Sequence, residues 1–330
     1  GLHLALKALG VTNGDIVWTS AITFVATSNA ALYCNADVDF VDIDPATMNM
    51  SIEALRYKLE VASANDKLPR IVIPVHMGGL PADMQAIHKL SKQYGFEIIE
   101  DASHAIGALY DAQKIGNCRY STLCVFSFHP VKIITSAEGG MVTTNDEVLA
   151  LKLSKLRTHG IQRSHPGQST KSGELWNYFQ DDLGYNYRLS ELHAALGLSQ
   201  VKKINHFIEK RKEIFDRYQY DLQELPVSIQ SWDYKANSSY HLMIVRLHVN
   251  DINTTKVEVY DFFLRNNIQA NFHYIPVYRH PYYQRLGFRK GYCPEAEKYF
   301  ADALSLPLHP SLTVENVERS ITTLKRSLIG

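Results

Sequence analysis

The chain has 330 residues, with 45 % hydrophobic and 21 % charged side chains, which is typical of a globular protein that folds around a core in water. Lys plus Arg and Asp plus Glu number 34 each, and no basic run is present, which argues against a nucleic-acid-binding protein. No apolar stretch approaches the length that crosses a bilayer, which argues against a membrane protein.

The cysteines show no metal-binding pattern. They form no CxxC pair, and none has a histidine nearby at the spacing of a zinc site: Cys34, Cys118, Cys124 and Cys293. We therefore expect no metal ion. Because such cysteine usage is typical of a reducing compartment, we expect a cytoplasmic protein.

The first predicted element is an amphipathic helix that is already under way at Gly1-Leu2-His3. No Met and no N-capping residue precedes it, although helices usually begin with a cap or a lead-in. We therefore expect that a natural N-terminal segment is absent from this sequence.

The first part of the chain alternates short β-branched runs with helical segments. Strands are predicted at residues 15–18, 38–43, 70–75, 97–100, 122–126 and 141–144. A helix is predicted at 81–94, because Pro81 starts it, apolar residues recur on one face and Gly95 follows it. This alternation predicts a largely parallel sheet covered by helices on both faces, in which ligands bind at the carboxyl ends of the strands.

The pattern changes after about residue 190. One long helix is predicted at 190–222, and two shorter helices are predicted at 255–266 and 294–304. Strands are predicted at 240–247 and 268–273. We therefore expect a large domain at residues 1–200 and a smaller α+β domain at residues 201–330.

An acidic residue follows the predicted strand at 97–100. Asp101 comes directly after Ile98-Ile99-Glu100 and begins the run Asp101-Ala102-Ser103-His104. Its carboxylate is expected at the carboxyl edge of the sheet, where ligands bind in sheets of this kind. The alternative interpretation is a helix N-cap, a position that Asp also favours.

A lysine follows the next predicted strand, at 122–126, and a glycine pair comes directly before the strand predicted at 141–144. Lys132 lies shortly after Leu123–Phe126, beyond Ser127 and Pro130. A buried amine there would have a lowered pKa and could form a Schiff base, whereas the alternative is an exposed loop lysine. Gly139-Gly140 fits a tight turn or a close approach of the backbone to a ligand.

These motifs, taken together, resemble the DegT/StrS-type family of sugar-nucleotide aminotransferases. Further matching stretches lie, in the family's order, at residues 21–27, 156–160 and 184–192, the last reading Gly-Tyr-Asn-Tyr-Arg-Leu-Ser-Glu-Leu. The resemblance implies fold type I of pyridoxal-phosphate enzymes: an α/β large domain with a mixed, mostly parallel sheet flanked by helices, and a smaller α+β C-terminal domain. It also implies pyridoxal 5'-phosphate as cofactor and glutamate as amino donor.

The resemblance assigns a role to each matching residue. Lys132 is expected to hold the cofactor as a Schiff base and to move the proton, and Asp101 to pair with the pyridine nitrogen so that the ring accepts electrons. Ser127 is expected to bind the cofactor phosphate, and His104 to lie near the ring oxygen. Phe24 is expected to stack on the ring, although such a phenylalanine is as often part of a core.

The resemblance also implies a homodimer with shared active sites. The family's counterpart of Asn186 comes from the neighbouring subunit and reaches the phosphate of the other site. A turn at the N-terminus of the first helix normally completes the phosphate site. Because Gly1 begins just after that turn, we expect the missing segment to have contributed to cofactor binding.

Several segments favour one branch of the family. Residues 135–138, 176–180, 271–278 and 280–283 are similar to enzymes that act on a UDP-linked 4-keto-6-deoxy-N-acetylhexosamine in pseudaminic acid synthesis. His273 and Tyr274 are expected to contact the sugar or its diphosphate, the alternative being aromatic packing. Trp176 could close a loop over the site, and Arg163, His165 and Lys171 are expected to be solvated.

Three alternatives remain open at this point. The enzyme could act on another nucleotide-linked keto sugar, since substrate choice depends on the shape of the pocket. Relatives that dehydrate sugars have His at the lysine position, and Lys132 argues against that reaction. A regulatory protein that binds the cofactor without catalysis would need neither Lys132 nor Asp101.

Overall fold

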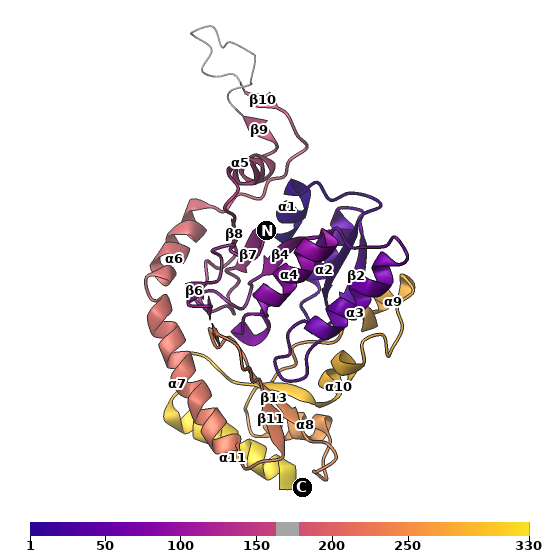
Figure 1. Cartoon of the computed structure of the whole chain (residues 1–330). Helices are drawn as coiled ribbons and strands as arrows, with labels where there is room; N and C mark the ends of the chain where they lie inside the picture. Colours follow the sequence, from indigo (N-terminus) through magenta and orange to yellow (C-terminus); the bar gives the residue numbers. More distant parts are fainter. Residues whose placement is uncertain (163–177, 330) are drawn as a thin grey trace.

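The computed structural model describes residues 1–162 and 178–329 (Figure 1). The predictions for Arg163, His165, Lys171 and Trp176 lie outside the described residues. In the described part of the chain, no helix is long and apolar enough to cross a membrane. In the same described residues, no group of three His, Cys, Asp or Glu side chains lies close enough together to bind a metal ion.

A six-stranded sheet in the order β2-β1-β3-β4-β7-β8 forms the centre of the molecule. Its strands are parallel except for β8, which pairs antiparallel with β7, so the predicted mixed, mostly parallel sheet is confirmed. The strands are β1 (Ile16–Ser20), β2 (Asp37–Val41), β3 (Ile71–Ile73), β4 (Glu97–Asp101), β7 (Leu123–Ser127) and β8 (Gly140–Thr143).

Helices cover both faces of this sheet, as the alternation of strands and helices predicts. One face buries apolar residues against α1 (Leu2–Ala8), α2 (Ala26–Tyr33) and α5 (Glu147–Leu156). The other face buries them against α3 (Ile52–Ser63) and α4 (Met84–Tyr94). Neighbouring residues of one strand point to opposite faces of the sheet: Val17 packs in the core on the side of α1, and Trp18 packs in the core on the side of α3.

The helix predicted at 81–94 begins three residues later than expected. The side chain of Asp83 accepts a hydrogen bond from the backbone N–H of Ala86 at 3.2 Å and caps α4, so the helix starts at Met84. Gly95 ends it with φ +79°, a left-handed conformation that glycine adopts readily.

The single helix predicted at 190–222 is wrong. Two helices occupy this stretch, α6 (Glu191–Val201) and α7 (Ile204–Leu222), and the chain leaves helical geometry at Lys203, with φ −105° and ψ 0°. They run one after the other along the edge of the molecule (Figure 1). The break leaves α7 to pack on the C-terminal part of the chain, while α6 buries none of its residues.

The C-terminal part contains an antiparallel three-stranded sheet of β11 (Val227–Ile229), β13 (Met243–Leu247) and β14 (Ala303–Leu306). Helices α7, α8 (Lys256–Arg265) and α11 (Val314–Ile329) share a core with it. The smaller α+β unit is thus present, and the boundary at residue 200 remains a prediction. The shorter elements are β5 (Leu109–Tyr110), β6 (Gln113–Lys114), β9 (Ile161–Gln162), β10 (Phe179–Gln180), β12 (Ala236–Asn237), the 3₁₀ turns η1 (Met77–Gly79) and η2 (Val277–Arg279), α9 (Pro281–Arg285) and α10 (Pro294–Asp302).

Two predictions for the C-terminal part are wrong. The helix predicted at 294–304 ends at Asp302, because the apolar run Ala303–Leu306 pairs with β13 as strand β14. The segment at 268–273 is not a strand, and it meets the sheet only through the bridge between Asn271 and Ser305.

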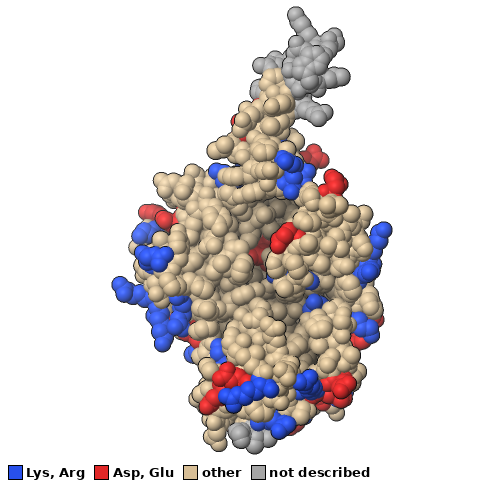
Figure 2. Space-filling view, turned by 180° about the vertical axis from the view of Figure 1, so that it is seen from behind, with Lys and Arg blue, Asp and Glu red and all other residues tan. Residues whose placement is uncertain are grey.

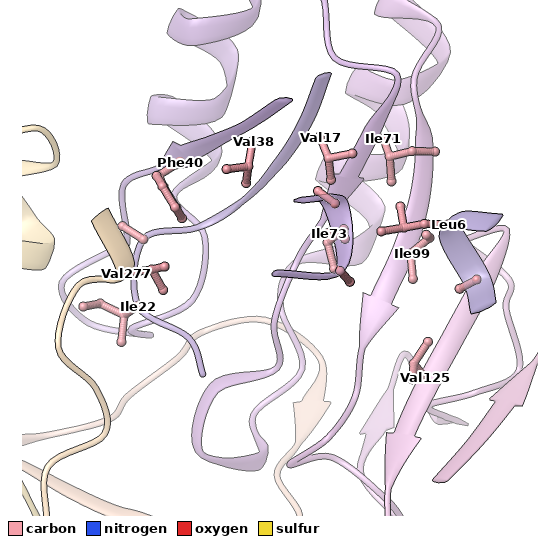
Figure 3. Packing of buried hydrophobic residues seen from close by; sticks show 14 of the residues in the cluster. Leu6, Val17, Ile22, Val38, Phe40, Ile71, Ile73, Ile99, Val125 and Val277 are labelled. Carbon is pink, nitrogen blue, oxygen red and sulfur yellow. The ribbon is translucent and has the colours of Figure 1, made fainter. Parts of the chain in front are cut away.

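The C-terminal part also contributes to the core of the large sheet (Figure 3). Val277 lies beside Ile22 in the same buried cluster, and its backbone N–H donates to the carbonyl of Ala21 at 3.0 Å. This contact brings the segment before Val277, with His273 and Tyr274, towards the carboxyl ends of the parallel strands.

The surface mixes both signs of charge. Acidic and basic side chains lie close together on the face shown in Figure 2, most densely at its lower end. This mixture agrees with the equal numbers of acidic and basic residues in the sequence.

Candidate active site

Asp101 lies at the carboxyl end of β4 and is buried, with 3 % of its surface exposed. Its Oδ2 accepts a hydrogen bond from Thr27 Oγ1 at 2.7 Å, and its Oδ1 accepts from Ser103 Oγ at 2.5 Å and from the Ser103 N–H at 3.1 Å. No helix begins here, so the N-cap alternative is wrong. A buried carboxylate held from two sides is fixed in direction before any ligand arrives.

Glu100, the residue before Asp101, points to the other face of the sheet. Its carboxylate contacts His76 Nε2 at 2.8 Å and accepts a hydrogen bond from Ser121 Oγ. Because neighbouring residues of a strand point in opposite directions, only one of the two acidic side chains faces the site. Glu100 is therefore paired on the far face of the sheet, and Asp101 is the carboxylate that faces the site.

Lys132 lies in the loop after β7, the strand beside β4 in the sheet. Its amine is largely desolvated, and this burial lowers its pKa from the ordinary value, while the negative charge of Asp101 offsets part of the effect. Ser127 ends β7, and its Oγ accepts a hydrogen bond from the His129 N–H at 3.4 Å. The sheet thus brings Lys132, Asp101 and Ser127 to the same edge.

His104 lies in the loop after Asp101 and meets Tyr274 of the C-terminal part. His104 Nε2 and the Tyr274 hydroxyl form a hydrogen bond of 3.1 Å, although the residues come from opposite parts of the chain. Burial lowers the pKa of His104 well below its ordinary value, and the nearby His241, Lys132, His273 and His76 lower it further. His104 is therefore a neutral imidazole at physiological pH.

His273 lies next to Tyr274 and close to the lysine. Its Nδ1 is 2.9 Å from Ser305 Oγ, and its ring meets that of Tyr274 edge-on at 5.0 Å. Burial, and then the charge of Lys132, lower the pKa of His273 to about 4. Both predicted substrate residues are thus brought to the carboxyl edge of the sheet.

Phe24 and Asn186 are exposed in the single chain. The ring of Phe24 is 58 % exposed and lies 6.1 Å from that of Tyr274, so it borders the site from the loop before α2. Asn186 bridges to Thr158 through the backbone in the arm that also carries β9 and β10 (Figure 1). Phe24 is thus beside the other site residues, and Asn186 is available to another molecule.

Three residues of the site were not predicted from the sequence. Thr27 and Ser103 bind Asp101, and the ring of His241 lies 4.4 Å from that of His104. Thr27 falls inside the matching stretch at 21–27, and Ser103 comes two residues after Asp101, so a hydroxyl at each of those places was the available signal. His241 carries no such signal, because only the fold brings it to His104.

Comparison with known proteins identifies a family for the whole chain. The sequence model of the DegT/DnrJ/EryC1/StrS aminotransferase family matches residues 1–325. A UDP-4-amino-4,6-dideoxy-N-acetyl-beta-L-altrosamine transaminase from Campylobacter jejuni is 37 % identical over 320 residues, which cover 96 % of this chain and 80 % of that protein. The spore coat polysaccharide biosynthesis protein SpsC from Bacillus subtilis is 35 % identical over 332 residues, 100 % of this chain and 83 % of that protein.

Solved structures agree with the sequence comparison. Helicobacter pylori PseC, an aminotransferase involved in the biosynthesis of pseudoaminic acid, superposes with a TM-score of 0.87 at 28 % identity. The superposition covers 99 % of this chain and 84 % of that protein. The expected architecture, fold type I of pyridoxal-phosphate enzymes, is confirmed.

Proposed function

Because the chain belongs to the DegT/DnrJ/EryC1/StrS aminotransferase family, we propose that it transfers the amino group of glutamate to a UDP-linked keto sugar. It is an aminotransferase, and its cofactor is pyridoxal phosphate. The proposed acceptor is a 4-keto-6-deoxy-N-acetylhexosamine on the route to a nonulosonic acid of the pseudaminic type. The names of the Campylobacter jejuni and Helicobacter pylori relatives support this choice.

One observation carries the proposal: a desolvated lysine and a fixed, buried carboxylate lie at the same edge of the sheet. Bound pyridoxal phosphate supplies an electron-accepting ring that stabilises the charge left when a C–H bond next to nitrogen breaks. Asp101 would keep a proton on the pyridine nitrogen, because a carboxylate there favours the charged ring. The chemistry of the three residues supports this cofactor, since an amine (Lys132), a carboxylate (Asp101) and a hydroxyl (Ser127) lie at the same edge of the sheet.

The remaining site residues would orient the cofactor and exclude water. Ser127 would donate its hydroxyl to the phosphate, and His104 would face the ring oxygen with the nitrogen that now meets Tyr274. Phe24 would cover one face of the ring, which would bury a side chain that is now largely exposed. His273 and Tyr274 would contact the sugar or its diphosphate beside the lysine.

Lys132 has the environment of a proton carrier. Its desolvated amine has a lowered pKa and loses a proton more readily than an exposed lysine does, which suits a base. The same amine, once protonated, can return the proton to a neighbouring carbon of the substrate. We therefore assign Lys132 both the attachment of the cofactor and the transfer of the proton.

The assembly in this proposal is a homodimer in which Asn186 of one subunit reaches the phosphate site of the other. The exposed position of Asn186 supports it, and so does α6, which is apolar but buries none of its side chains in the single chain. A cytoplasmic location is also part of the proposal, and the four free, buried cysteines support it.

The first experiment records the visible absorption of the protein with pyridoxal phosphate, then adds glutamate, and repeats both steps with Lys132→Ala. We expect a band that glutamate bleaches in the wild-type protein and that does not form in the variant. Purified keto sugars linked to UDP are then added in turn, and the substrate is the one that restores the band. A band that does not respond to glutamate would contradict the proposed amino donor.

A second acceptor class has specific support. The match to SpsC, which is named for spore coat polysaccharide biosynthesis, favours a sugar outside the pseudaminic route. Other nucleotide-linked keto sugars therefore belong in the same absorption assay, and restoration of the band by one of them would replace the acceptor and leave the reaction unchanged.

A further inference from the structure

The ring of His241 packs directly on the ring of His104. Their centroids lie 4.4 Å apart with an angle of 40° between the planes, and 4 % of His104 and 6 % of His241 are exposed. Among the described residues, neither Nδ1 atom has a hydrogen-bond partner. The contact between these two histidines is therefore made by ring packing.

The segment that carries His241 is fixed to the large sheet unit. The His241 N–H donates to the carbonyl of Gly78 at 2.8 Å, and the Ser239 hydroxyl donates to the carbonyl of His104 at 2.8 Å. A Cβ on Gly79 would lie 2.5 Å from Ser239 Oγ, so the approach of the two segments requires glycine there. The backbone of His104 and that of His241 are thus held together.

A buried arginine fixes the same segment from the other side. Arg211 of α7 donates to the carbonyls of Tyr240, His241 and Leu308 at 3.3, 3.2 and 2.8 Å. The guanidinium holds the chain where Tyr240 takes a left-handed conformation, with φ +54°. His241 is therefore set in place by its backbone, and its ring has little freedom to leave His104.

We propose that His241 is a positioning residue, whose ring holds the His104 imidazole with Nε2 directed at Tyr274 and the reacting centre. This inference rests on the proposed function in one respect, which is that His104 contacts the cofactor. Two neutral rings can lie in contact without repulsion, and burial lowers the pKa of both histidines well below the ordinary value. Without the ring of His241, His104 would gain rotational freedom and lose its alignment.

The test compares His241→Ala, which removes the ring, with His241→Phe, which keeps a flat ring without nitrogens. We expect the alanine variant to slow the first-order rate of the glutamate half-reaction by about tenfold, because a small displacement of an aligned group costs about that much or more. The dissociation constant for glutamate should stay within about twofold, since His241 does not touch the donor. We expect the phenylalanine variant to restore the rate to within about threefold.

A second measurement does not depend on activity. Nitrogen-15 spectra of the histidine rings in the cofactor-free protein report the tautomer and mobility of His104, and the melting temperature reports folding. We expect a single tautomer in the wild-type and phenylalanine proteins and averaged signals in the alanine variant. His206→Ala, which removes an exposed histidine, is the matched control and should change none of these readouts.

Two results would overturn the inference. One is a rate and a His104 spectrum that stay the same in His241→Ala, and the other is a phenylalanine variant as slow as the alanine variant. If wild-type protein fails the glutamate assay, the proposed function fails, and the ring spectra of the cofactor-free protein still decide whether His241 holds His104.

Discussion

At the scale of single residues, the site depends on how firmly Asp101 is held. Its carboxylate has hydroxyl donors on two sides, Thr27 and Ser103, and none of these three side chains is more than partly exposed. A charged hydrogen bond of this kind is worth about 1.5–3 kcal/mol. The direction of the carboxylate is thus a property of its neighbours as well as of the strand.

Thr27→Val should slow the glutamate half-reaction by about tenfold to a hundredfold, because it removes one charged hydrogen bond from Asp101. Thr27→Ser keeps the hydroxyl and should stay within about threefold of the wild-type rate. Stopped-flow absorption of the cofactor-loaded protein measures both. Equal rates in the valine and serine variants would show that the hydroxyl does not act through Asp101.

The pKa of His273 gives the protein a pH-dependent stability. It is about 4 in the folded protein against an ordinary value of 6.5, so the unfolded chain binds the proton first as the pH falls. The contribution of neutral His273 is complete above pH 6.5 and is lost between pH 6.5 and 4. Its size over this window is on the order of 3 kcal/mol.

Both the wild-type protein and His273→Asn should become less stable when the pH is lowered from 7 to 4.5. The drop in the free energy of unfolding should be about 2–3 kcal/mol smaller for His273→Asn than for the wild-type protein, because the variant lacks the buried imidazole. Urea unfolding at the two pH values measures the difference. His206→Asn, a change at an exposed histidine, should follow the wild-type protein. A His273 variant that loses as much stability as the wild-type protein would contradict the burial of this ring as a neutral group.

At the scale of elements, α6 exposes more apolar side chains than a helix of a single chain usually does. Leu192, Leu196, Leu198 and Val201 are exposed, and no residue of the helix is buried. An apolar helix is normally covered on most of its surface. In the dimer proposed above, a second copy of the chain covers this helix, and Asn186 reaches the neighbouring site.

Leu192→Lys combined with Leu196→Lys should convert a dimer into a monomer, because two charges would be buried at the contact. Light scattering coupled to size exclusion measures the change. Val257→Lys, at an exposed valine of α8, should leave the dimer intact. A wild-type protein that is monomeric at micromolar concentration would contradict the proposed assembly.

The proposed sharing of active sites between subunits can be tested separately. Lys132→Ala and Asn186→Ala should each be inactive alone. A mixture that exchanges subunits should regain activity, because one site of each mixed dimer then contains both the lysine and the asparagine.

At the scale of the whole molecule, local signals predicted the elements well and their ends less well. The strands of the large sheet are where the β-branched runs predict them. The break at Lys202-Lys203 has no glycine or proline to mark it, and Ala303–Leu306 reads equally well as the end of a helix. Pairing with β13 decides the second case, and such pairing depends on residues far away in the chain.

The residues of the site also differ in how far the sequence alone predicts them. Asp101 and Lys132 could be predicted because each lies at or shortly after the end of a strand, and parallel strands bring their carboxyl ends together; Ser127, the last residue of β7, was expected through the resemblance. Tyr274 and His273 were expected through resemblance, and their contacts with His104 and Ser305 come from the fold. His241 could not be predicted, since nothing near it in the sequence shows that its ring meets His104.

The segment Ser239–His241, with its bonds to Gly78 and His104, sets an order of assembly during synthesis. All six strands of the large sheet leave the ribosome before residue 150, whereas His241 and Tyr274 follow much later. Until then the His104 ring lacks both neighbours that direct it. In a newly made chain the His104 ring is therefore directed only after the last third has folded back, and the same step completes the core of the large sheet with Val277.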